Sequence, residues 1–89
     1  MKRMHMLITG RVQAVGFRYF VEEHASRLGL KGFVRNTENR EVEVVAEGES
    51  DALLELHQLC EKGPRHSQVE EVKVVYDEPA GEFYGFEVA

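Results

Sequence analysis

The apolar residues change their spacing across a glycine-bounded break near the N-terminus, and this change constrains the fold more than any other feature. Before the break every second residue is apolar, at Met4, Met6 and Ile8, which predicts a strand over residues 4–9. The break runs from Gly10 to Gly16. After it, one face at helical spacing carries Phe17, Val21, His24, Ala25 and Leu28. The chain therefore begins with a strand that leads directly into a helix, which we expect to end at Gly29.

The same reasoning assigns the rest of the chain. Two apolar segments joined by a polar turn predict a hairpin with strands over 31–36 and 42–47. A second helix is predicted to start near Glu49 or Ser50 and to end before Gly63 and Pro64. Its apolar residues are Ala52, Leu53, Leu56, Leu59 and Cys60. A fourth strand is predicted over 69–76 and a short fifth over 84–88.

The predicted order is βαββαβ with one added strand at the C-terminus. Two right-handed β-α-β crossovers of this kind make a ferredoxin-like α+β sandwich. Both helices then lie on one face of a mainly antiparallel sheet. Since 89 residues suffice for one modest core, we expect a single domain over residues 1–89.

Composition excludes several classes of protein. The net charge is −5, whereas non-specific nucleic-acid binding needs a basic surface. No apolar run approaches the ~20 residues of a membrane span, and the N-terminal run is too short for a signal peptide. The single cysteine, Cys60, cannot form an intramolecular disulfide, so a cytoplasmic protein is expected. We expect no nucleic-acid or membrane partner and a monomer.

The junction from Gly10 to Arg18 is the stretch with the most chemical content. Where a strand turns into a helix, unpaired backbone N–H groups point outward at the positive end of the helix dipole, and they can bind an anion. The guanidinium of Arg18 matches phosphate oxygens in a bidentate way. The residues alone leave open that the glycines only shape a turn and that Arg18 is solvated. A nucleotide-binding loop of the Walker type is excluded, because its glycine spacing and its Lys-Ser/Thr pair are absent.

Gly10-Arg11-Val12-Gln13-Ala14-Val15-Gly16-Phe17-Arg18 resembles the first signature of the acylphosphatase family, GRVQGVGFR. The segment 32–36, continued through 42–48, is similar to the second signature. The resemblance covers nearly the whole chain and implies an enzyme that hydrolyses acyl phosphates to a carboxylate and inorganic phosphate. It implies no metal and no organic cofactor, and it makes a small acyl phosphate and inorganic phosphate the partners.

The resemblance also implies roles for individual residues. The phosphoryl group would be bound by Gln13, Ala14, Val15, Gly16, Phe17 and Arg18. Asn36 would orient the attacking water. Arg18 and Asn36 are thus the expected catalytic residues.

Two positions depart from the family pattern, which has glycine where this chain has Ala14 and Arg40. At Ala14, a Cβ either forces strain at positive φ or turns one peptide of the loop away from the anion. In the hairpin turn, we expect Asn39 to supply the left-handed residue in place of Arg40.

Three other functions were weighed. An RNA-binding module would need aromatic residues on its central strands, and segment 42–47 has none. A piece of a larger carbamoyl-transferring maturation enzyme is disfavoured, because no zinc-finger cysteines follow. A catalytically weak or silent anion-binding domain of the same fold remains the alternative, on account of Ala14.

Other polar residues are given structural interpretations. The histidines show no metal-site spacing, and Cys60 is expected to be a buried apolar residue. Arg35 and the set Glu41, Glu43 and Glu47 are expected to lie on a solvated face of the sheet.

Overall fold

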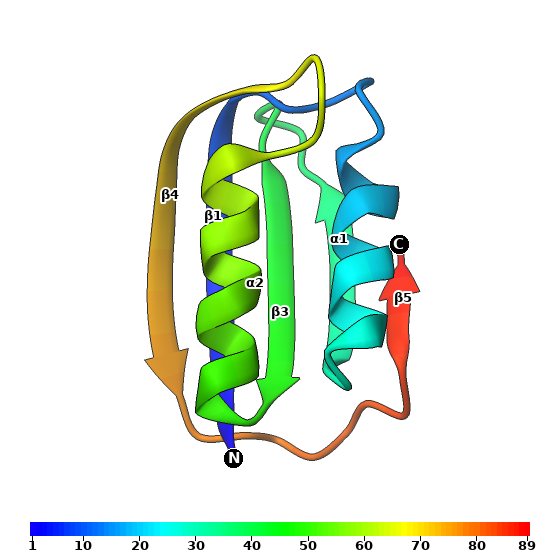
Figure 1. Ribbon diagram of the computed structural model, residues 1–89, viewed down its shortest axis with the longest axis vertical. Coiled ribbons are helices and arrows are strands. Elements are labelled where there is room, and N and C mark those ends of the chain that lie inside the picture. The colour runs from blue at the N-terminus through cyan, green and yellow to red at the C-terminus, as the bar shows by residue number, and fades with distance from the viewer.

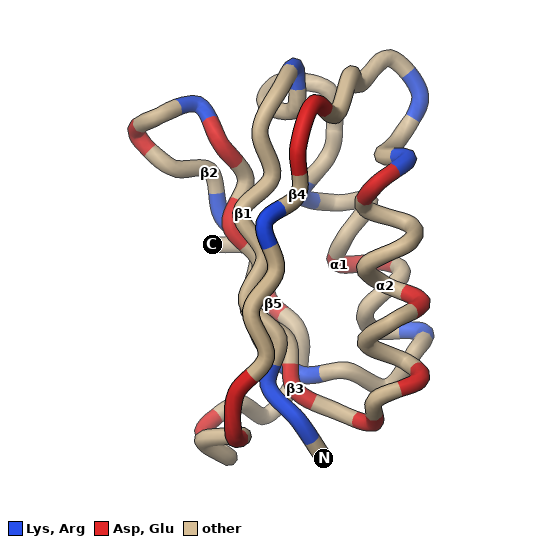
Figure 2. Tube along the Cα trace, turned by 90° about the vertical axis from the view of Figure 1, so that its left-hand side faces the viewer, with Lys and Arg blue, Asp and Glu red and all other residues tan.

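The computed structural model describes all 89 residues and contains five strands and two helices. In chain order these are β1 (Lys2–Arg11), α1 (Phe17–Arg27), β2 (Lys31–Asn36), β3 (Val42–Gly48), α2 (Ser50–Lys62), β4 (Gln68–Asp77) and β5 (Phe86–Val88). Both helices lie on the same face of one sheet (Figure 1), so the molecule has two layers (Figure 2). Neither helix has the length and apolar character to cross a membrane.

The sheet has the strand order β4-β1-β3-β2-β5. The three pairs formed by the first four strands of the chain are antiparallel, and only β5 pairs in parallel, with β2. This confirms the predicted ferredoxin-like α+β sandwich with an extra C-terminal strand. One consequence matters for the site: β3 separates β1 from β2.

The core lies between the sheet and the helices, as the apolar spacing predicts. Alternate residues of β1 and every third or fourth residue of the helices are fully buried. They include Met4, Met6, Ile8, Val21, Ala25, Leu53, Leu56 and Cys60. Burial raises the pKa of the Cys60 thiol to about 12, so the thiol stays protonated and unreactive. Cys60 is therefore a core residue, as predicted.

Two strands differ from the prediction by more than one residue at an end. β1 continues through Gly10 and Arg11, which pair with Val69 and Gln68 after a register shift between Thr9 and Gly10. The strands approach so closely there that a Cβ on Gly10 would lie 2.1 Å from the Gln68 carbonyl oxygen. β5 is shorter than predicted and begins at Phe86.

The sheet face without helices is less solvated than predicted. Glu47 is only 4% exposed, and its carboxylate accepts hydrogen bonds from the Ala80 and Gly81 N–H groups at 2.7 and 3.1 Å. The interpretation of Glu47 as solvated is therefore wrong, because the segment between β4 and β5 covers it. Glu43 is half-buried as well; its carboxylate is hydrogen-bonded to the His5 imidazole and forms an ion pair with Arg35.

Candidate active site

Two loops that are far apart in the sequence lie at the same end of the molecule (Figure 1). β1 and β2 are both antiparallel to β3, so they run parallel to each other and their C-terminal ends point the same way. The loop of residues 12–16 follows β1, and the turn of residues 37–41 follows β2. The topology therefore brings the expected phosphate-binding loop close to the strand end that carries Asn36.

The loop backbone has the features of an anion site. None of the N–H groups of residues 13–18 donates a hydrogen bond within the protein. Gly16 is the N-cap of α1 and has φ 79°, a left-handed conformation that glycine adopts without steric cost. No side chain caps the helix. The free N–H groups at the positive end of α1 are therefore available to an anion.

Ala14 also has a left-handed backbone, with φ 62°. Of the two outcomes that the sequence left open, the structure shows the first: the alanine is held in the conformation that a glycine would adopt. Such a conformation costs a residue with a Cβ roughly 1–2 kcal/mol, and the loop tolerates it.

A hollow of about 220 Å³ lies at this junction. It is lined by Val12, Ala14, Gly16, Phe17, Arg18, Tyr19 and Asn36. Arg18 and Asn36, expected from different parts of the sequence, thus share one hollow. Gln13 and Val15 do not line it. Val12 and Tyr19 were not expected to line the hollow. Their position next to Gln13 and Arg18 was the only feature of the sequence that could have indicated them.

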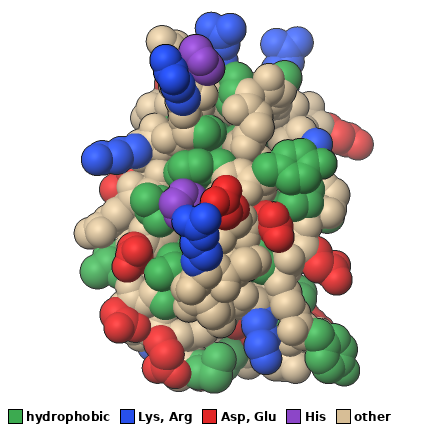
Figure 3. Space-filling model, turned by 45° about the vertical axis from the view of Figure 1, so that its right-hand side comes forward, with side chains coloured by type: hydrophobic (Ala, Val, Ile, Leu, Met, Phe, Trp, Pro, Cys, Tyr) green, Lys and Arg blue, Asp and Glu red, His purple; other side chains and the backbone are tan.

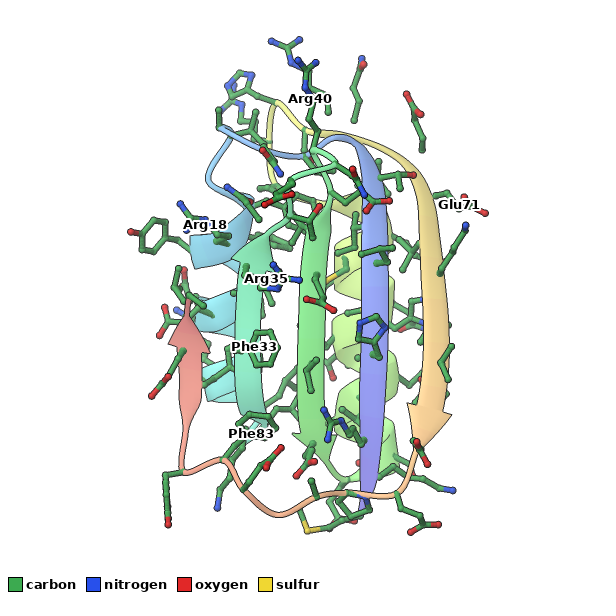
Figure 4. The ribbon with its side chains drawn as sticks, turned by 180° about the vertical axis from the view of Figure 1, so that it is seen from behind. Arg18, Phe33, Arg35, Arg40, Glu71 and Phe83 are labelled. Atoms are coloured by element: carbon green, nitrogen blue, oxygen red, sulfur yellow. The ribbon has the colours of Figure 1, made fainter.

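Arg18 is partly held by the C-terminal strand. Its Nη1 donates a hydrogen bond to the Ala89 carbonyl oxygen at 3.0 Å, and Figure 4 shows its side chain beside the end of β5. The other guanidinium N–H groups have no partner in the protein. Arg18 is therefore oriented but keeps donors free for a ligand.

The charge around the site differs from that of the whole chain. Figure 3 shows Lys and Arg side chains gathered at the end where the loops meet, while most acidic side chains in that view lie further down. Arg11 and Arg40 line a second, adjacent hollow of about 270 Å³ with Gly10, Val12 and Gln13. Neither arginine forms an ion pair. An anion approaching this end therefore meets a positive potential although the net charge is −5.

The turn beside the site corrects one prediction. Arg40 itself is left-handed, with φ 64°, and Asn39 is not. The Thr37 hydroxyl accepts hydrogen bonds from the N–H groups of Asn39 and Glu41 at 3.3 and 3.2 Å. These bonds fix the positions on either side of Arg40, so the left-handed residue falls at Arg40.

The lining of the hollow limits the chemistry that it can support. It contains no carboxylate, imidazole or thiol, and no three His, Cys, Asp or Glu side chains gather anywhere to ligate a metal ion. What it offers is a set of hydrogen-bond donors: free backbone N–H groups, one guanidinium and one carboxamide. Such a site suits a phosphoryl group with a polar nucleophile beside it.

The chain is similar to known proteins over nearly its whole length. The family model described as Acylphosphatase matches residues 4–88. An acylphosphatase of Trichormus variabilis is 49% identical over 97% of this chain and 84% of its own length. One from Moorella thermoacetica is 50% identical over 90% and 86%. The crystal structure of acylphosphatase from Bacillus subtilis superposes with a TM-score of 0.96 at 32% identity, covering 100% of this chain and 99% of that one.

Proposed function

The chain belongs to the acylphosphatase family and hydrolyses acyl phosphates, and from this premise we propose how its residues carry the reaction. The observation that supports the proposal is the single hollow shared by Arg18, Asn36 and the loop. The phosphoryl oxygens accept hydrogen bonds from the N–H groups of residues 13–18 and from Arg18. Asn36 holds the attacking water.

The reaction needs little acid or base from the protein. The water oxygen bonds to phosphorus, and the bond from phosphorus to the bridging oxygen breaks, so that the carboxylate leaves. A carboxylate is a good leaving group and needs no protonation. The hollow is lined by no residue that could act as a base, so the water's proton passes to a phosphoryl oxygen of the substrate. Positioning and electrostatic stabilisation supply the rate enhancement.

We also propose the setting in which the enzyme works. Its partners are a small acyl phosphate and inorganic phosphate, with no nucleic acid, since the net charge is −5. It acts as a monomer in the cytoplasm, which agrees with the buried, unpaired Cys60. Sedimentation of the purified protein at several concentrations tests the monomer.

Phosphate release from acetyl phosphate tests the activity, and Arg18 variants test the site. We expect Arg18→Ala to weaken both turnover of acetyl phosphate and binding of inorganic phosphate by about 10–150-fold, since a charge-assisted contact contributes roughly 1.5–3 kcal/mol. Arg18→Lys should recover only part, because an ammonium lacks the planar fork.

Arg27→Ala is the matched control, since Arg27 lies on the same helix, is 71% exposed and pairs only with Glu23. Unchanged kinetics in Arg18→Ala would remove Arg18 from the mechanism. Phosphate binding without any phosphate release by the wild-type protein would favour the silent anion-binding domain instead.

A further inference from the structure

Gln13 does not line the hollow, and its side chain joins the loop to the neighbouring turn. Its Nε2 donates two hydrogen bonds, to the Thr37 carbonyl oxygen at 3.0 Å and to the Glu41 carbonyl oxygen at 2.9 Å. Thr37 directly follows Asn36, and Gln13 directly precedes Ala14. One carboxamide thus connects the two halves of the site at positions adjacent to their functional residues.

The turn that receives Gln13 is closed by its own hydrogen bonds. The Thr37 N–H donates to the Glu41 carbonyl at 2.9 Å, and the Arg40 N–H donates to the Thr37 carbonyl at 3.3 Å. Gln13 therefore binds the second lone pair of two carbonyl oxygens that are already paired. The turn keeps its internal structure without Gln13, so the two added bonds determine where the turn lies relative to the loop.

The sheet does not provide this connection. β3 lies between β1 and β2, so the end of β1 and the end of β2 share no backbone hydrogen bonds. No other hydrogen bond joins residues 12–16 to residues 36–41. Gln13 is the one polar link across this gap.

We propose that Gln13 is a positioning residue that sets the place of Asn36, and hence of the attacking water, relative to the bound phosphoryl group. This role rests on the proposed function. In-line attack depends on the placement of the water, and a displacement of about 1 Å can cost about 10²-fold in rate. The phosphoryl group is held separately, by the loop N–H groups and Arg18. Loss of the Gln13 side chain therefore affects turnover and leaves binding in place.

Gln13→Met tests this role, because methionine keeps the length of the side chain and removes both donors. With acetyl phosphate we expect kcat to fall about 10–100-fold, while KM and the Kd of inorganic phosphate stay within about twofold. Retained phosphate binding also shows that the variant is folded. Gln58→Met is the matched control: Gln58 is an exposed glutamine on α2, and its replacement should change neither kcat nor KM.

Gln13→Glu provides a second readout that a merely structural role would not produce. An ionised carboxylate repels both carbonyl oxygens, whereas a protonated carboxyl group donates one hydrogen bond. The ratio of kcat in Gln13→Glu to kcat in the wild type should therefore rise as the pH falls toward about 4, the usual range of a glutamic acid. Because the substrate titrates in the same way in both assays, its contribution to the pH dependence cancels in this ratio.

Three results would overturn the proposal. Gln13→Met with wild-type kcat would show that the link does not matter for turnover. A raised KM and phosphate Kd with unchanged kcat would assign Gln13 to binding. If the methionine variant does not fold, a ratio for Gln13→Glu that stays flat with pH would decide against the role. An inactive wild-type protein would instead overturn the proposed function, and this role with it.

Discussion

Ala14 carries strain within the proposed phosphate-binding loop. Its φ of 62° lies in the region that glycine adopts without penalty, and its side chain is exposed. The fold therefore gains nothing by burying this methyl group. The strain persists because the loop is fixed at both sides, by the end of β1 and by Gly16 at the start of α1.

Ala14→Gly should leave kcat/KM for acetyl phosphate within about threefold of the wild type, which corresponds to about 0.6 kcal/mol in the barrier. The alanine already holds the conformation that the glycine would supply. The free energy of unfolding should change by less than about 1 kcal/mol, since relief of strain is offset by the greater freedom of glycine in the unfolded chain.

Ala14→Val tests whether the loop depends on a left-handed residue at position 14, because a β-branched residue is more strained at positive φ. We expect denaturant unfolding to show lower stability and the activity assay a lower kcat/KM. A stable and active valine variant would contradict the claim that the loop depends on a left-handed residue at position 14.

Asn36 should contribute to turnover much more than to affinity. We expect Asn36→Ala to lower kcat by about 10²-fold, because an unoriented water attacks poorly, while KM stays nearly constant. Asn39→Ala is the control: Asn39 is exposed in the same hairpin, and no hydrogen bond involves its side chain. A raised KM with normal kcat in Asn36→Ala would assign Asn36 to substrate binding.

At the scale of the elements, β3 links its two neighbours through Glu43 on the open face of the sheet. The carboxylate accepts a hydrogen bond from Nε2 of His5 on β1 at 2.7 Å and another from Nε of Arg35 on β2. Figure 4 shows Arg35 on this face, beside Phe33. The hydrogen bond from His5, with a smaller contribution from Arg35, holds the pKa of Glu43 below its ordinary value, although burial acts in the opposite direction.

This lowered pKa predicts a pH dependence of stability. A carboxyl group whose pKa is lower in the folded state stabilises the protein above the unfolded-state value of 4.5, and that stabilisation is lost as the pH falls through the folded-state value. Glu43→Gln should therefore lower the free energy of unfolding at pH 7 by about 1 kcal/mol. The difference from the wild type should shrink below pH 4.5.

Denaturant unfolding of the wild type and Glu43→Gln at pH 7, 5 and 3.5 measures this. Glu71→Gln is the control, since Glu71 lies on β4, is exposed and its carboxylate has no partner. A difference between wild type and Glu43→Gln that is constant over this range would show that the charge of Glu43 does not contribute.

The elements themselves could be predicted from the sequence where one face is buried against the helices. Met4, Met6 and Ile8, and the helical residues that face them, follow regular spacing because they share one core. The face of the sheet without helices shows no such regular apolar spacing. Glu47 looks like a solvated strand residue, and it is buried because backbone N–H groups of residues 80 and 81 meet it. Local patterns cannot show a contact with a segment so distant in the sequence.

At the scale of the molecule, the sequence predicts which residues form the site but not which contacts their side chains make. The motif residues place Arg18 and Asn36, and the parallel course of β1 and β2 brings them together. Gln13 was expected to bind the phosphoryl group as part of the loop, and no pattern in the sequence indicated that its side chain contacts the turn. Its direction depends on how two separate segments pack, which no spacing along the chain records.

The proposed phosphate site should couple ligand binding to the stability of the whole fold. It is assembled from the end of β1, the start of α1 and the end of β2, and Arg18 reaches the carbonyl of Ala89 beyond β5. Unfolding separates all of these segments, so under the proposed function only the folded state binds inorganic phosphate. At ten times its Kd, phosphate should add about 1.4 kcal/mol to the free energy of unfolding. For a domain of this size, that raises Tm by roughly 6–11 °C.

Thermal unfolding of the wild type and Arg18→Ala, with phosphate and with sodium chloride at equal ionic strength, measures this coupling. Phosphate also stabilises proteins non-specifically by exclusion from their surface, and that contribution is the same in both proteins. The expected result is a large rise in Tm for the wild type and only the small non-specific rise for Arg18→Ala. Equal rises would mean that phosphate does not stabilise the fold through this site.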